Sequence, residues 1–177
     1  MNGGVQGAVL ITGVYGSGKS SVAQEITVLL AKRNAPYALL DLDFLGWFDT
    51  RGEGGPTEHS VMLKNLAALV GNYLAVGVEF FVFAGAIRDR AELDNLKAEL
   101  RMAMRVVRLT VPLREIEKRL RSEVTTGRRE DLREAAVWLA GSIGVGIEDV
   151  TVSNDRPIQE VAAEILDWLG WGDFALA

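Results

Sequence analysis

The stretch GVYGSGKS, residues Gly13–Ser20, decides how the rest of this sequence is interpreted. It fits the pattern G-x-x-x-x-G-K-[ST], whose glycines let the backbone turn tightly, so that successive N–H groups can point at phosphate oxygens. An apolar run precedes the stretch, and a helical pattern starts at Lys19, so the positive end of a helix dipole would face the same anion. The segment therefore predicts a nucleotide-binding loop between a buried strand and a helix.

Each polar group of this loop has a predicted role in binding ATP and Mg²⁺. The ammonium of Lys19 can reach the β- and γ-phosphates, and the hydroxyl of Ser20 can ligate Mg²⁺. The residues predicted to bind the nucleotide are Gly13, Gly16, Ser17, Gly18, Lys19, Ser20 and Ser21.

Length and composition narrow the class of protein. The chain has 177 residues, 49% of them hydrophobic and 24% charged, which predicts a single globular domain over residues 1–177. It contains no cysteine and a single histidine, His59, so thiol chemistry is excluded and a histidine-based metal centre or triad has little support. The net charge of −5 gives no reason to expect a nucleic-acid partner.

The sequence also indicates where the protein works. No signal-peptide pattern is present, and no apolar run reaches the roughly 20 residues that a membrane-spanning helix needs. We expect a cytoplasmic protein without membrane partners, working as a monomer or a homodimer.

Short apolar runs alternate with segments of helical periodicity, which predicts an α/β fold with a parallel sheet covered on both faces. The predicted strands are Ala8–Thr12, Tyr37–Leu42, Val78–Ala84, Arg105–Val111 and Asp149–Val152. The predicted helices run from Lys19 to near Asn34, over His59–Ala75, over Asp89–Leu100, from Pro112 past Leu120, around Leu132–Leu139, and from Pro157 to Gly170. A break in the helical pattern is expected at Thr125–Arg129.

Two carboxylates at the end of the second predicted strand are candidates for the chemistry. Asp41 and Asp43 stand two positions apart, so on an extended chain both would project from one face. At the carboxyl edge of the sheet they would lie beside the phosphate loop, where one could hold Mg²⁺ and the other could accept a proton from an attacking hydroxyl. A solvated strand end followed by a turn is the alternative.

Other classes of nucleotide-binding protein fit the sequence less well. Asp49–Gly52 spells D-x-x-G, but no N-K-x-D follows, as a GTPase would require. The predicted strand Val78–Ala84 ends without the carboxylate expected of a transport-type ATPase.

The order of motifs resembles that of the P-loop small-molecule kinases, among them shikimate kinase, gluconate kinase and adenylylsulfate kinase. The matching segments are GVYGSGKS at 13–20, LLDLDF at 39–44, FAGAIRD at 83–89 and RLRSEVTTGRR at 119–129. The resemblance implies a three-layer fold with a five-stranded parallel sheet in the order 2-3-1-4-5 and a short lid at about 119–130. It also implies ATP-dependent phosphorylation of a hydroxyl on a sugar acid, a nucleoside or an antibiotic-like molecule. A regulatory ATPase or GTPase that acts on a protein partner is the alternative.

The same resemblance suggests roles for residues outside the loop. Asp41 would bind Mg²⁺ together with Ser20, and either Asp41 or Asp43 would be the base. In the lid, Arg119 would contact the nucleotide and Arg128 or Arg129 the phosphates, although exposed helix pairs such as Glu115–Arg119 would explain such arginines equally well. The loop Asn154–Pro157, with Asp155, would lie beside the adenine or form a plain polar turn.

The acceptor site is expected between the second strand and the next helix, and at the turn after the third strand. Asp43, Trp47, Arg51, Gly85 and Arg88 are the predicted acceptor-binding residues. Phe44 and Trp47 either form a wall of this site or pack in the core. The other tryptophans, Trp138, Trp168 and Trp171, are interpreted as packing residues, and His59 as a surface residue near a helix start.

Overall fold

A computed structural model describes residues 5–46, 58–121 and 126–172 of the chain. Its strands are β1 (Gly7–Thr12), β2 (Tyr37–Asp41), β3 (Phe80–Ala84), β4 (Arg105–Thr110) and β5 (Val150–Ser153). Its helices are α1 (Lys19–Lys32), α2 (Glu58–Ala75), α3 (Arg90–Leu100), α4 (Leu113–Arg121), α5 (Thr126–Ala140) and α6 (Ile158–Leu169), with a short 3₁₀ helix η1 at Leu42–Phe44.

The strands form one parallel sheet in the order β2-β3-β1-β4-β5, as the resemblance implied. The register pairs Ile11 with Ala84 and Asp41 with Ala84, so the carboxyl ends of β1, β2 and β3 are level. Because all strands run the same way, the segments that leave these ends converge on one edge of the sheet. That edge holds the phosphate loop after β1, η1 after β2 and the turn after β3.

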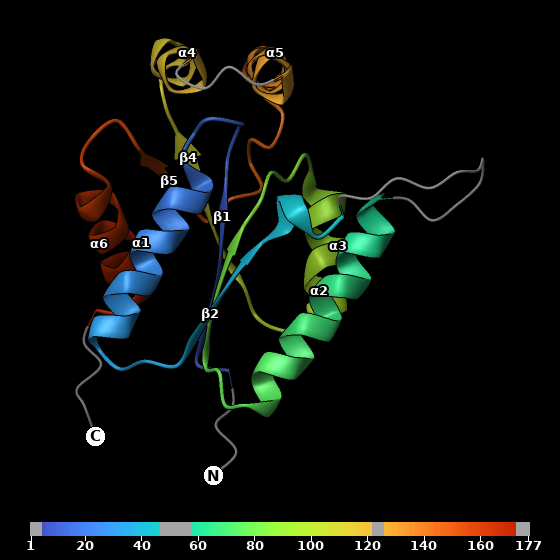
Figure 1. Cartoon of the computed structure of the whole chain (residues 1–177), viewed down its shortest axis with the longest axis vertical. Helices are drawn as coiled ribbons and strands as arrows, with labels where there is room; N and C mark the ends of the chain where they lie inside the picture. The colour runs from blue at the N-terminus through green and yellow to red at the C-terminus, as the bar shows by residue number, and fades with distance from the viewer. Residues whose placement is uncertain (1–4, 47–57, 122–125, 173–177) are drawn as a thin grey trace.

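Helices cover both faces of the sheet, which gives the three layers seen in Figure 1. The apolar faces of α1 and α6 pack on one side, with Ile26 and Val161 fully buried against Val9. On the other side α2 and α3 pack through Leu66 and Leu93. Strands covered on both faces read as continuous apolar runs, and every residue of β3 is buried.

Beyond the carboxyl ends of the strands lie α4 and α5, which contact each other above the phosphate loop (Figure 1). Among the described helices, none is both long and apolar enough to cross a membrane.

Several predicted boundaries differ from the structure by one or two residues, and two differences bear on the site. The strand β2 ends at Asp41, and the chain turns into η1 because an Asp41 carboxylate oxygen accepts a hydrogen bond from the Asp43 N–H at 3.2 Å. The expected break at Thr125–Arg129 is helical from Thr126 onward, as the start of α5. Thr126 and Gly127 have low helix propensity, but the first N–H groups of a helix have no intrahelical acceptor, so weak helix formers are tolerated there.

Candidate active site

The phosphate loop joins β1 to α1 in the backbone conformation that its glycines permit. Gly13, Gly16 and Gly18 all have positive φ, at 142°, 77° and 93°. Added Cβ atoms would lie 2.7 Å from the Leu109 carbonyl at Gly13 and 2.9 Å from Ile116 at Gly16. Both the backbone conformation and the close neighbours therefore require glycine, which explains the spacing in the sequence.

Lys19, the first residue of α1, places a cation under the loop. Only 6% of the residue is exposed, and its ammonium lies 3.4 Å from the Val14 carbonyl oxygen and 5.0 Å from the centre of the Tyr15 ring. Burial lowers the pKa of Lys19, while Asp43 and Asp41 oppose that change. Lys19 makes no direct ion pair within the described residues, and a buried cation of this kind is costly unless an anion joins it, so this loop fits a bound phosphate chain.

Ser20 and Asp41 form the oxygen pair that the sequence predicted as a metal site. The Ser20 hydroxyl donates to a carboxylate oxygen of Asp41 at 2.6 Å, across the ends of α1 and β2. Oxygen ligands of this kind suit Mg²⁺, which usually keeps waters and takes further ligands from substrate phosphates. Among the described residues no cluster of three or more acidic or histidine ligands forms. A cation held here would depend on the nucleotide for the rest of its shell.

Asp43, in contrast, faces the segment that follows β3 and lines a cavity there. The start of η1 turns its carboxylate toward the segment after β3, where the Ala86 N–H donates to it at 3.4 Å. The side chain is open to the cavity, yet the surrounding protein removes part of its water. This desolvation raises the pKa of Asp43; Lys19 opposes the shift and Asp41 adds to it. A carboxylate that is open on one side and has a raised pKa suits proton transfer.

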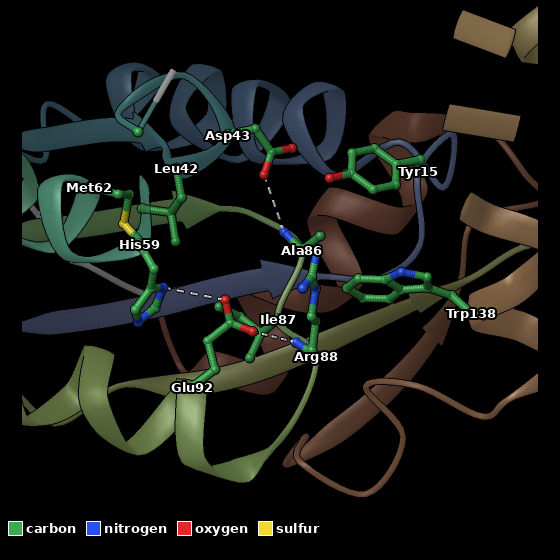
Figure 2. A pocket seen from close by; sticks show the side chains of 11 residues that line it. Tyr15, Leu42, Asp43, His59, Met62, Ala86, Ile87, Arg88, Glu92 and Trp138 are labelled. Atoms are coloured by element: carbon green, nitrogen blue, oxygen red, sulfur yellow. Dashed lines mark hydrogen bonds and ion pairs between the residues drawn. The ribbon is translucent and has the colours of Figure 1, made fainter. Parts of the chain in front are cut away.

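Next to Asp43 opens a cavity of about 610 Å³, a volume typical of small-molecule sites. Figure 2 shows side chains from several elements pointing into it. The lining residues are Tyr15, Leu42, Asp43, Gly46, His59, Met62, Ala86, Ile87, Arg88, Glu92 and Trp138.

One wall of the cavity is polar. Glu92, in the first turn of α3, accepts from the Arg88 N–H at 2.7 Å and faces His59 Nδ1 at 3.5 Å (Figure 2). The N-cap of α3, Asp89, accepts from the Glu92 N–H at 2.9 Å and so fixes the start of this helix. Arg88, on the turn before α3, also lines the cavity.

The facing wall is aromatic. Tyr15 of the phosphate loop and Trp138 of α5 meet edge to face, with ring centres 6.2 Å apart. Burial and the nearby Asp43 raise the pKa of Tyr15 to about 12, so its hydroxyl stays protonated at neutral pH. Figure 2 shows this hydroxyl directed toward the Asp43 side of the cavity.

Of the predicted lid residues, Arg119 on α4 lies directly against the phosphate loop. Its guanidinium donates to the carbonyl oxygens of Gly16 at 3.4 Å, Ser17 at 3.3 Å and Asn154 at 2.7 Å. Arg128 belongs to α5, and its side chain lies outside the described part of the structure. Arg119 therefore reaches the nucleotide loop from the lid side by way of backbone carbonyls.

The remaining predicted residues divide into three groups. Gly85 is buried at the turn. A Cβ added to it would lie 2.9 Å from the side chain of Leu42. Ser21 and Asp155 are exposed beside the loop and after β5. Trp47 and Arg51 lie outside the described residues.

Some sequence interpretations need correction. Phe44 is 66% exposed, so the core interpretation is wrong for it. Phe44 is not among the described residues that line the cavity. His59, interpreted as a surface residue, lines the cavity and faces Glu92. Trp138 packs, as expected, but also faces the cavity. Helical periodicity could not predict that His59 and Trp138 line the cavity, because it assigns a residue to one side of a helix but does not say which element packs against that side.

The Gly18→Ala substitution should damage this site most directly. At φ 93° an alanine is strained, and its Cβ would lie 2.4 Å from Asn154 Nδ2. We expect a loss of about 1–3 kcal/mol in the free energy of unfolding, together with weaker ATP binding. Gly71→Ala in α2 is the matched control: nothing lies within 4 Å of its added Cβ, so it should stabilise by about 0.5–1 kcal/mol. Denaturant unfolding and calorimetric ATP titration test both; equal effects of the two substitutions would contradict the assignment.

Comparison with known proteins gives structural matches. No protein-family model and no curated protein matches the sequence. A sugar kinase from Janibacter sp. HTCC2649 is 20% identical with a TM-score of 0.67, over 93% of this chain and 94% of that one. A gluconokinase from Sinorhizobium meliloti 1021 is 20% identical with a TM-score of 0.61, and the match covers 95% of this chain and 94% of the gluconokinase. The APS kinase CysC of Mycobacterium tuberculosis is 24% identical with a TM-score of 0.58, and the match covers 94% of this chain and 99% of CysC.

These matches extend over nearly the whole chain, and all three matched proteins are named as kinases of small molecules. The strand order and the position of the phosphate loop agree with the resemblance that the sequence motifs indicated. The chain has the fold of the P-loop small-molecule kinases.

Proposed function

We propose that this protein is a kinase that transfers the γ-phosphoryl group of ATP to a hydroxyl of a small molecule. One observation carries the proposal: Asp43 stands between the phosphate loop and a cavity of about 610 Å³, so a hydroxyl in that cavity would meet both a base and the end of the phosphate chain. The matched CysC structure contains AMPPNP together with APS, which supports a nucleotide and an acceptor sharing this fold.

Separate residues would serve the nucleotide and the acceptor. Lys19 and the loop N–H groups would bind the phosphates, and Ser20 with Asp41 would hold Mg²⁺, which supplies charge neutralisation at the phosphates. Because Asp41 is engaged by Ser20, Asp43 is the better placed base. The acceptor oxygen would form a bond to the γ-phosphorus as the bridging oxygen leaves with ADP, and the acceptor proton would pass to Asp43.

The aromatic wall of the cavity would bind the acceptor rather than act in the chemistry. We expect Trp138→Leu to raise the acceptor KM about three- to tenfold with little change in kcat, because a packing contact is lost equally in ground and transition states. Trp168→Leu, on α6 and away from the cavity, is the control. Steady-state kinetics with the identified acceptor tests this; an unchanged KM in the Trp138 variant would contradict it.

A coupled assay of ADP release separates this proposal from a regulatory nucleotidase. The protein is incubated with ATP and Mg²⁺ and with sugar acids, nucleosides, aminoglycosides or other hydroxylated antibiotics. A kinase forms ADP much faster with the right acceptor. Slow hydrolysis that no acceptor accelerates would favour the regulator that acts on a protein partner.

A further inference from the structure

Asn154, directly after β5, is buried among the elements that carry the phosphate loop. The residue is 4% exposed, and its own N–H donates to the Thr110 carbonyl at 2.9 Å, which fixes it to the end of β4. Its side-chain Nδ2 donates to the Ser17 carbonyl at 2.7 Å. A polar side chain this deeply buried needs partners, and Asn154 finds one in the backbone of the phosphate loop.

Arg119 approaches the same carbonyl from α4. Its Nη1 lies 3.3 Å from the Ser17 oxygen and 3.4 Å from the Gly16 oxygen, while Nη2 donates to the Asn154 carbonyl at 2.7 Å. The fork of one guanidinium thus joins the lid helix, the phosphate loop and the segment after β5. Charged donors make stronger hydrogen bonds than neutral ones.

These contacts determine the orientation of one peptide group. In a trans peptide the C=O of one residue and the N–H of the next point in opposite directions. Holding the Ser17 carbonyl toward Asn154 and Arg119 therefore turns the Gly18 N–H the other way, toward the side of the loop where phosphate would bind. The close approach of Asn154 to Gly18, 2.4 Å from where a Cβ would stand, leaves this peptide little room to rotate.

We propose that Asn154 and Arg119 form a clamp of positioning residues that holds the Ser17–Gly18 peptide in its phosphate-binding orientation before nucleotide arrives. The effect on ATP affinity rests on the proposed function, whereas the order of the loop without nucleotide does not. Because Arg119 stands on α4, movement of this helix would loosen the loop at the same time.

The test compares Asn154→Ala with Ser153→Ala, the exposed neighbour at the end of β5. Amide hydrogen exchange is measured on the nucleotide-free proteins, and ATP–Mg²⁺ affinity by calorimetry. In Asn154→Ala we expect the Ser17 amide, whose N–H donates to the Val14 carbonyl at 3.1 Å, to exchange faster, and Kd for ATP to rise about tenfold, as for loss of a buried hydrogen bond. Ser153→Ala should match the wild type in both.

Arg119→Lys is the second variant, and it applies even if Asn154→Ala fails to fold. It keeps the charge but loses the fork, so we expect faster exchange of the Ser17 amide and a smaller rise in the Kd for ATP than in Asn154→Ala. Loop exchange and affinity equal to wild type in a folded Asn154 or Arg119 variant would overturn the clamp. If the wild-type protein binds no ATP, the proposed function fails, and the exchange rates alone still decide whether the clamp exists.

Discussion

Lys19→Met is expected to lower ATP turnover about 10³-fold while leaving the fold intact. The ammonium is the buried cation of the phosphate loop, and removing a preorganised donor from a site of developing negative charge costs a factor of this order. Methionine keeps the length and apolar character of the stem. Steady-state ADP release at saturating ATP and the best acceptor measures the loss.

The stability of this variant distinguishes a functional lysine from a structural one. Burial lowers the pKa of Lys19, so the native state disfavours its charged form, and removing that charge should leave the free energy of unfolding unchanged or higher. Lys32→Met, at the exposed end of the same helix, should retain full turnover. If the turnover of Lys19→Met stays within a fewfold of wild type, Lys19 does not have the phosphate-binding role predicted for it.

Asp43→Asn should lower acceptor-dependent turnover about 10²–10⁴-fold while ATP still binds. The amide keeps the shape of the side chain but cannot take the hydroxyl proton, and loss of a general base costs about 10²–10⁴-fold. Asp94→Asn, an exposed carboxylate on α3, is the matched control and should behave as wild type. ADP release and calorimetric ATP titration on both variants give the comparison.

The same substitution has a predicted effect on stability and pH. Desolvation raises the pKa of Asp43 in the folded protein, so folding favours its protonated form, and ionisation above that pKa weakens the native state. Asp43→Asn should therefore be at least as stable as wild type at neutral pH. Wild-type acceptor-dependent turnover should fall as pH drops through this raised pKa, above the usual range of an aspartate. If the residual turnover of Asp43→Asn still falls in the same way at low pH, a group other than Asp43 causes the fall.

The strands, the helices and the phosphate loop could be predicted because each of their signals is local, whereas the strand order followed from the family resemblance. The glycine spacing of residues 13–20 predicted the loop, and the alternation of apolar runs with helical periodicity predicted the sheet and its covering helices. Ser20 and Asp41 were predicted as a pair. The Ser20 hydroxyl oxygen lies 2.6 Å from a carboxylate oxygen of Asp41, because parallel strands end at one edge of a sheet.

Much of the acceptor cavity could not be predicted, because it depends on contacts between distant segments. His59 meets Glu92 only because α2 and α3 pack side by side, and Trp138 reaches Tyr15 only because α5 lies over the phosphate loop. The loop that holds Asn154 was expected beside the adenine or as a plain polar turn, but its contact with the Ser17 carbonyl depends on how β5 ends next to β4. No spacing in the sequence encodes these distances.

Mass spectrometry of the acceptor shows whether the protein transfers a phosphoryl group to a hydroxyl. Wild type and Asp43→Asn are incubated with ATP, Mg²⁺ and the hydroxylated compound that most accelerates ADP release. With wild type, we expect this compound to gain the mass of one phosphoryl group in step with ADP formation. With Asp43→Asn, we expect the phosphorylated compound to form about 10²–10⁴-fold more slowly. ADP formation without a phosphorylated compound, at equal rates in both proteins, would contradict the proposed transfer.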